Sequence, residues 1–192
     1  MAGLTQDDIA HFLHANDKLL DSVKLPELQI ISQIPLISSA DIDWIEVRPS
    51  KYGNGLFATK DIPANRCITL YPTHQIAYKV LKEDNEWQVI SPQGEPTYYR
   101  DYSLDVSDQL KIAGIPYLIH NLLFVGHILN DPCPDVNIQN KEEWIARYDQ
   151  LDPNAEYRHI KDLWMGIFST RDIKAGEELF SCYGTTYWLG RA

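Results

Sequence analysis

The sequence has few cysteines, fewer basic than acidic residues and no long apolar run. Its three cysteines, Cys67, Cys133 and Cys182, form no Cys-x-x-Cys pair, which argues against a disulfide framework or a zinc site. The chain shows no basic segment followed by an apolar one at its start, so no secretory signal is visible. The most apolar segment, residues 115–129, is too short to span a bilayer, and we interpret it as a buried helix. These absences predict an intracellular protein, nuclear or cytoplasmic, that binds no metal and no membrane.

Basic residues are outnumbered, with 17 Lys and Arg against 27 Asp and Glu and a net charge of −10. An acidic surface repels the phosphate backbone, so we expect no direct binding to nucleic acid. The same surface attracts a basic protein or peptide, although acidity also serves solubility alone. A chain of 192 residues, 44% of them hydrophobic, is long enough for one domain with an extension.

Short segments with apolar and polar residues in alternation, bounded by glycine or proline, predict a mainly β domain over residues 44–192. The helical spacing of apolar residues near the N-terminus predicts a helical extension over residues 1–43. Within the main domain we expect a polar, variable insert at about 76–112 and a helical insert at about 141–162. The expected strands lie at residues 44–48, 56–58, 67–71 and 163–169.

A weak internal repeat links the two ends of the main domain. Residues 56–65 and 167–176 share Phe, Thr, Asp, Ile and Ala at one constant offset. Two copies are too few for a solenoid. The repeat instead predicts two similar strand–turn–strand units, unless the likeness is due to chance.

The stretch Gly53-Asn-Gly-Leu-Phe-Ala58 matches a dinucleotide-binding pattern in form only. That pattern needs a helix directly after it to hold a pyrophosphate, and Thr59-Lys-Asp-Ile-Pro63 is not helical. Two interpretations remain: a tight turn that needs positive φ, or a bare backbone that a ligand approaches closely.

Three further features have both a structural and a functional interpretation. The loop Asn130-Asp-Pro-Cys-Pro-Asp-Val-Asn137 is either an ordered turn or a place where the Asn130 side chain binds a ligand carboxylate or amine. Cys182 is interpreted as a buried small residue rather than a nucleophile, because no signature surrounds it. The eleven tyrosines either belong to the core or form an aromatic channel for a lysine side chain.

Four motifs follow one another in the main domain. They are Gly53-Asn-Gly-Leu-Phe-Ala58, then Tyr102, then Gly126-His-Ile-Leu-Asn130 with Cys133 and Asn137, then Gly176-Glu-Glu-Leu179 with Tyr183-Gly-Thr-Thr-Tyr-Trp188. In this order they resemble the SET-domain protein lysine methyltransferases, and the ending resembles the compact SET proteins of large DNA viruses. The resemblance implies an α+β fold, mainly β with short helices. It consists of several small curved β-sheets with a knot-like threading of the C-terminal segment (β-clip type).

The resemblance also implies the activity, an S-adenosylmethionine-dependent protein-lysine N-methyltransferase that acts on a histone tail or another basic protein. Tyr183 and Tyr102 would be the catalytic residues. Tyr187, Ser181 and Tyr102 would line the lysine channel. The cofactor would be bound by Gly53, Asn54, Gly55, Asn130, Asp131 and Trp188.

The chain departs from the family in three respects. Asn130-Asp-Pro-Cys133 stands where the family has Asn-His-Ser-Cys, which leaves a catalytically degenerate, SET-like binding module as the alternative function. The position two before Tyr183 is Ser181 rather than Phe or Tyr, which favours addition of more than one methyl group. No zinc-binding cysteine segment follows the core, so residues 1–43, the 76–112 insert or a second subunit of a homodimer would close the lysine channel.

Overall fold

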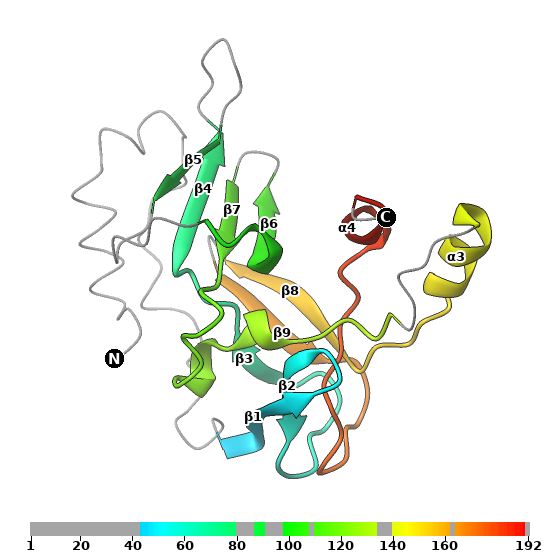
Figure 1. Cartoon of the computed structure of the whole chain (residues 1–192). Coiled ribbons are helices and arrows are strands. Elements are labelled where there is room, and N and C mark those ends of the chain that lie inside the picture. Colours follow the sequence, from blue (N-terminus) through cyan, green and yellow to red (C-terminus); the bar gives the residue numbers. More distant parts are fainter. Residues whose placement is uncertain are drawn as a thin grey trace.

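Within its described residues, the computed structural model has three small β-sheets, and the short helices α3 (Lys141–Tyr148) and α4 (Thr185–Leu189) lie at one side of them (Figure 1). The structure describes residues 43–79, 87–90, 98–107, 110–133, 140–161 and 164–190. The predicted extension, residues 1–43, lies almost entirely outside the described residues, as does Asn137. Small β-sheets with few short helices confirm the predicted α+β class.

The first sheet is the hairpin of β1 (Ile45–Ser50) and β2 (Gly53–Ala58), which pair antiparallel from Ile45 opposite Ala58 to Ser50 opposite Gly53. The predicted strand at residues 44–48 is confirmed. The second strand begins at Gly53, earlier than predicted, because Lys51 and Tyr52 alone form the turn.

The second sheet has the order β3–β9–β8, formed by Cys67–Leu70, Trp164–Ser169 and Ala155–Lys161. The predicted strands at 67–71 and 163–169 are confirmed. The helical prediction for residues 141–162 holds only for α3 (Lys141–Tyr148) and is wrong for β8. Asn140 caps α3 by accepting a hydrogen bond from the Glu143 amide, and Pro153 follows the helix.

The third sheet occupies the region that we predicted to be an irregular polar insert. It has the order β5–β4–β7–β6, in which every pair is antiparallel. The short 3₁₀ helix η3 (Arg100–Tyr102) leads into this sheet. Its strands are β4 (Gln75–Lys79), β5 (Trp87–Ile90), β6 (Ser103–Ser107) and β7 (Leu110–Ala113).

The segment 115–129 is buried in part but is not the single helix that we predicted. It forms two 3₁₀ turns, η4 (Leu122–Phe124) and η5 (Gly126–Ile128), separated by Val125. The Thr69 hydroxyl explains this break, because it donates to the carbonyl of Leu122 and accepts from the amide of Val125. These two bonds tie the segment to β3 and interrupt helical pairing.

The two copies of the internal repeat pair with each other. Ile62 and Ile173, which are equivalent positions, exchange two backbone hydrogen bonds of 2.8 Å. Asp61 accepts from the Ala175 amide, and Asp172 accepts from the Ala64 amide, the reciprocal bond between equivalent residues. The repeat is therefore a local two-fold arrangement that brings the start of the C-terminal segment, residues 173–190, to the first hairpin.

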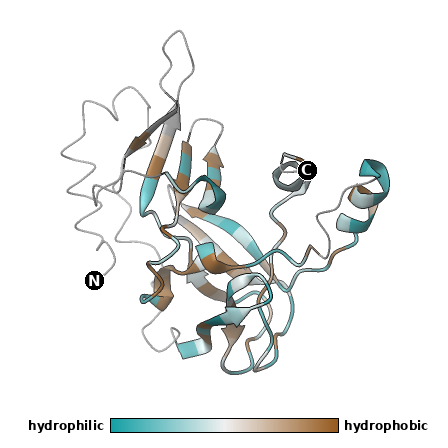
Figure 2. Ribbon diagram, viewed as in Figure 1, coloured by the Kyte–Doolittle hydropathy of each residue, from teal (hydrophilic) through white to brown (hydrophobic). Residues whose placement is uncertain are grey.

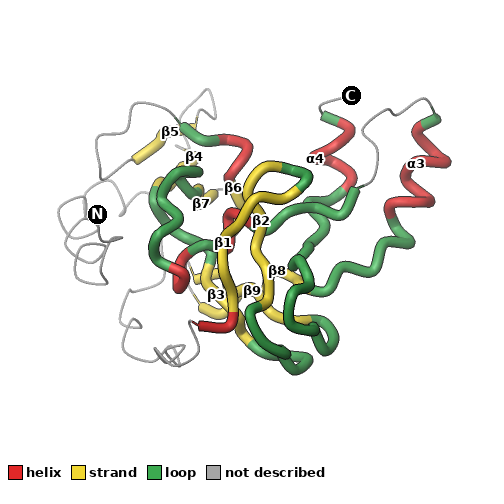
Figure 3. The backbone as a smooth tube through the Cα atoms, turned by 60° about the horizontal axis from the view of Figure 1, so that its bottom comes forward, coloured by secondary structure: helices red, strands yellow, loops and turns green. Residues whose placement is uncertain are grey.

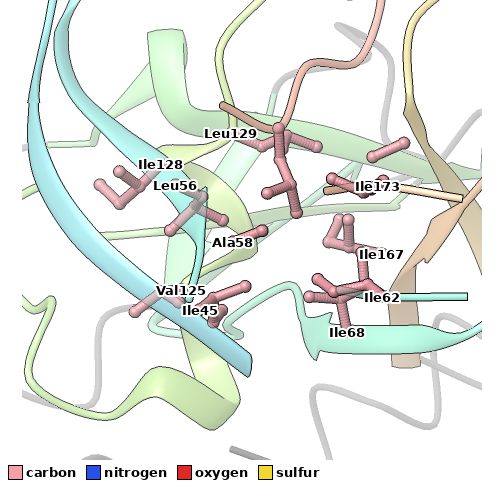
Figure 4. Close-up of a cluster of buried hydrophobic side chains, with 12 residues drawn as sticks. Ile45, Leu56, Ala58, Ile62, Ile68, Val125, Ile128, Leu129, Ile167 and Ile173 are labelled. Carbon is pink, nitrogen blue, oxygen red and sulfur yellow. The ribbon is translucent and has the colours of Figure 1, made fainter. Parts of the chain in front are cut away.

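One buried cluster of hydrophobic side chains connects the first hairpin, β3, β9 and the turns at 125–129 (Figure 4). Ile173 and Leu179 of the C-terminal segment belong to this cluster and are fully buried. The segment is hydrogen bonded to β2 through the Leu179 amide, and to Asn130 through the Ser181 amide. The first part of this segment, which carries Ile173 and Leu179, is thus part of the core, whereas the knot-like threading stays a prediction.

Candidate active site

A cavity of about 640 Å³ lies between the first hairpin, the loop at 127–131, the end of η3 and the C-terminal segment. This volume is in the range of small-molecule and cofactor sites. Six tyrosines contribute to its wall: Tyr52, Tyr71, Tyr102, Tyr157, Tyr183 and Tyr187. The cavity therefore brings together both predicted catalytic tyrosines and the predicted channel residue Tyr187.

Tyr183 is held at three points. Its hydroxyl donates to the carbonyl of Leu129 at 2.7 Å, and its backbone amide donates to the Asp131 carboxylate at 2.7 Å. Its ring stacks on Trp188 and meets the edge of Tyr187, with centroids 6.2 and 4.9 Å away. Burial is the main cause that raises the pKa of Tyr183 far above its ordinary value, so the hydroxyl remains a neutral hydrogen-bond donor.

Three tyrosines of the wall were missed by the sequence analysis. The Tyr71 hydroxyl donates to the carbonyl of Tyr102 at 2.6 Å, which fixes the backbone at the end of η3. Tyr157 meets the edge of the Tyr71 ring at 5.9 Å, and Tyr52 lies in the turn of the first hairpin. Tyr157 belongs to a segment that we predicted to be helical, so its orientation had no signal in the sequence.

Asn130 lines the cavity with a side chain whose amide nitrogen is already engaged. That nitrogen donates to the carbonyl of Asn54 and to the carboxylate of Glu178, each at 3.0 Å. Because a carbonyl oxygen can only accept hydrogen bonds, the Asn54 carbonyl must face the nitrogen of the Asn130 side chain and not its oxygen. Only the Asn130 oxygen is left for a ligand, which favours an amine over a carboxylate.

The two glycines of the first hairpin have different roles. Gly53 has a φ of 103° and lines the cavity, which confirms the tight turn with positive φ. Gly55 does not line it. A Cβ at Gly55 would lie 2.4 Å from the Glu178 carboxylate and 3.1 Å from the Asn130 amide, so this bare backbone makes room for those side chains rather than for a ligand.

Asp131 lines the cavity, although this residue is only 4% exposed. One carboxylate oxygen accepts from the Tyr148 hydroxyl at 2.6 Å, the Tyr183 amide at 2.7 Å and the Trp188 indole at 3.0 Å. The other oxygen accepts from the Cys133 amide at 2.7 Å. We name these five residues the Asp131 cluster. The resemblance placed Asp131 in the cofactor site, and in the structure its side chain joins α3, the 130–133 loop and the C-terminal segment.

Asn154, like Asn130, anchors the C-terminal segment. Its amide nitrogen donates to the carbonyl of Glu178 at 2.9 Å, and its oxygen accepts from the Phe180 amide at 2.8 Å. The sequence analysis placed Asn137 in the same motif as Asn130, and Asn137 lies outside the described residues. The dipeptide Pro153-Asn154 directly before a strand was the signal that could have identified Asn154.

Ser181 and Cys182 differ from their predicted places. Ser181 is buried and is not among the residues that line the cavity, so its size does not set the room there. Cys182 lines the cavity, but burial raises the pKa of its thiol. A raised pKa lowers the thiolate fraction, which argues against a nucleophilic cysteine.

His127 also lines the cavity and pairs with His74, with ring centroids 5.6 Å apart. Its Nε2 meets the carbonyl of Ile115 at 3.1 Å, and the Ile115 amide donates to Nδ1 of His74. Burial lowers the pKa of His127 to about 3 and that of His74 to about 4. Both imidazoles are therefore neutral near pH 7 and too weakly basic to remove a proton from a lysine ammonium.

Within the described ranges, no group of three His, Cys, Asp or Glu side chains is arranged to hold a metal ion. In the same part of the chain, no helix has the length and apolar character needed to cross a membrane. Tyrosines, Trp188 and the Asn130 and Asp131 residues are thus the polar and aromatic part of the cavity wall on which the chemistry of the site depends.

Comparison with known proteins supports the sequence motifs. A search of curated proteins gave no significant match. A family model, the SET domain, matches residues 53–184, a range that begins at β2, includes the second and third sheets and ends just after Tyr183. Since this match spans more than half of the chain, the chain belongs to the SET domain family.

Proposed function

We propose that this protein is an S-adenosylmethionine-dependent protein-lysine N-methyltransferase with a basic protein or peptide as its substrate. The observation that carries this proposal is the Tyr183 hydroxyl, held on the Leu129 carbonyl in the wall of a cavity lined by five other tyrosines. Membership of the SET domain family supports a methyltransferase type of activity. The acidic character of the chain, with a net charge of −10, favours a basic partner.

The cavity residues fit the cofactor in size and in hydrogen-bonding chemistry. The free oxygen of Asn130 suits the amino group of the methionine part, and Gly53 and Asn54 offer backbone beside it. Trp188, whose indole N–H is bonded to Asp131, offers a ring face for the adenine. When bound, S-adenosylmethionine would supply a methyl group that the lone pair of the lysine nitrogen attacks while the sulfur keeps the bonding electrons.

The tyrosines prepare the lysine for this attack. A free lysine has a pKa of about 10.4, so at neutral pH almost all of it is the unreactive ammonium. Transfer into a cavity walled by Tyr102, Tyr157 and Tyr187 removes water from the amine and lowers its pKa, because desolvation disfavours the charged form. The walls also align the amine with the methyl group, which lowers the barrier by orientation. The proton leaves to solvent, and no histidine of the cavity is needed as a base.

The test is transfer of tritium from labelled S-adenosylmethionine to core histones and to a cell extract. Tyr183→Phe should reduce the transfer by at least about a hundredfold and leave the fold intact, because the hydroxyl on Leu129 is lost while the ring packing remains. Tyr117→Phe is the matched control, since Tyr117 is 56% exposed and does not line the cavity. Wild-type activity in Tyr183→Phe would refute the role of Tyr183.

The alternative, a SET-like module that only binds partners, predicts a different result. A degenerate site would show neither label transfer nor saturable heat when the purified protein is titrated with S-adenosylmethionine. Binding of the cofactor without label transfer would instead mean that the right substrate protein was absent from the mixture. Asp131 motivated this alternative, but its hydrogen bonds to Tyr183 and Trp188 organise the cavity rather than disrupt it.

A further inference from the structure

The Asp131 carboxylate is a buried charge whose hydrogen-bond partners are all neutral donors. Two of them are backbone amides, and the others are the Tyr148 hydroxyl and the Trp188 indole. In all four bonds the carboxylate is the acceptor, and both of its oxygens take part. Among the ion pairs formed by the described residues, none contains Asp131. The four hydrogen bonds offset part of the cost of burying this carboxylate, and a cationic ligand in the cavity would offset more of it.

The Asp131 carboxylate is close to the cavity as well as to the 130–133 loop. Asp131 is one of the cavity-lining residues. It also contributes, after burial, to raising the pKa values of Tyr157 and Tyr183 on the same wall. Trp188 shares the carboxylate with Tyr183, so the charge lies at the end of the cavity that the proposed function gives to the cofactor.

We propose that Asp131 is a specificity-determining residue that makes the cavity prefer a cationic sulfonium ligand to the neutral thioether that remains after methyl transfer. This inference rests on the proposed function. The sulfonium of S-adenosylmethionine would bring a positive charge into the cavity, whereas the sulfur of S-adenosylhomocysteine carries none. The consequence is easy release of the thioether product, because the attraction disappears when the methyl group and its charge leave.

The experiment compares two ligands that differ by one methyl group and one charge. Dissociation constants for S-adenosylmethionine and S-adenosylhomocysteine are measured by calorimetry on the full chain. The ratio of the two constants isolates the charge, because a purely structural change in the site weakens both ligands alike. The wild-type protein should prefer the sulfonium, and Asp131→Asn should reduce that preference by about tenfold.

Two variants serve as controls for this ratio. Tyr148→Phe removes a hydrogen bond from the carboxylate but keeps its charge, so both constants should rise together and their ratio should stay unchanged. Asp101→Asn removes an exposed carboxylate from the wall of the same cavity. Water screens that charge, so the ratio should change by less than about twofold.

An unchanged ratio in Asp131→Asn would overturn the inference and leave the proposed function standing. An equal change in Asp101→Asn would also overturn it, since the preference would then follow the total charge. If wild-type protein binds neither ligand, the proposed function fails together with the inference. Should Asp131→Asn not fold, wild-type protein is titrated with an analogue that carries a protonated amine in place of the sulfonium. This analogue should bind more tightly than the thioether, and equal affinities would refute the role of Asp131.

Discussion

Replacement of Tyr148 by phenylalanine tests whether the Asp131 cluster holds the C-terminal segment in place. The Tyr148 hydroxyl donates to Asp131 and accepts from the Gly184 amide at 2.9 Å. The ring itself stacks on Trp144 with centroids 5.0 Å apart and is buried. Phenylalanine keeps the ring and its packing, so the change removes only the two hydrogen bonds. In Figure 3, α3 and the C-terminal helix α4 (Thr185–Leu189) lie on the same side of the molecule.

The expected loss follows from these two bonds. A hydrogen bond to a charged group contributes about 1.5–3 kcal/mol, and an amide left without a partner costs about 1 kcal/mol or more. We therefore expect Tyr148→Phe to lower the free energy of unfolding by about 3 kcal/mol. For a domain of this size, that change corresponds to a fall in Tm of roughly 6–12 °C.

The assay is urea unfolding followed by circular dichroism, with Tyr117→Phe as the exposed control. A double-mutant cycle with Asp131→Asn should give a coupling energy of at least about 1 kcal/mol, because the two side chains are directly bonded. A loss below about 0.5 kcal/mol in Tyr148→Phe would refute the reasoning, since α3 would then pack beside the site without holding it.

Three further predictions concern stability and ligand binding. Burial lowers the pKa of His74 to about 4 and of His127 to about 3, while unfolded histidines take up protons near pH 6.5. The free energy of unfolding should therefore fall by up to ~4 kcal/mol from pH 7 to pH 5 in urea titrations, and a flat profile would contradict this. Asn154→Ala should cost about 2–3 kcal/mol in the same assay, because it removes both bonds to the C-terminal segment. Gly55→Ala should weaken S-adenosylmethionine binding at least about tenfold in calorimetry, because the new methyl group collides with Glu178; unchanged affinity would refute this contact.

The parts of the fold that the sequence predicted are those with a strong local pattern. The strands at 44–48, 67–71 and 163–169 alternate or carry runs of β-branched and aromatic residues, and each is a strand in the structure. The repeat was visible for the same reason, because Ile62 and Ile173 occupy equivalent places in two similar turns. What the sequence could not provide is that these equivalent residues bond to each other.

The wrong predictions have tertiary causes. The apolar segment 115–129 has helical composition, but the Thr69 hydroxyl takes up a carbonyl and an amide within it and breaks the helix. Residues 155–161 have mixed polarity that suits a helix surface, yet they pair with β9 along their whole length. In both cases a partner far away in the sequence decided the local structure.

The sequence predicted the site residues that stand in motifs, but it did not predict the other residues that line the cavity. Tyr102, Tyr183 and Tyr187 stand in recognisable motifs, and all three line the cavity. Tyr71 directly follows β3 and Tyr157 lies in β8, and these are the two outer strands of the second sheet, so only the folding of that sheet brings the two rings together. The roles of all these residues in methyl transfer stay predictions until the variants are measured.

The segment between Asp131 and Asn154 explains how the site accommodates its departure from the family motif. Both residues hold the C-terminal segment, Asp131 through the Tyr183 amide and Asn154 through Phe180. The intervening helix α3 is mainly hydrophilic (Figure 2), but its buried residues Trp144 and Tyr148 pack toward the cavity side. A histidine at position 131 could not accept four hydrogen bonds, whereas a carboxylate can. Aspartate at position 131 and tyrosine at position 148 therefore depend on each other, because the Tyr148 hydroxyl donates to the Asp131 carboxylate. Both side chains also accept a hydrogen bond from a backbone amide, that of Tyr183 for Asp131 and that of Gly184 for Tyr148, and so fix the backbone that carries Tyr183.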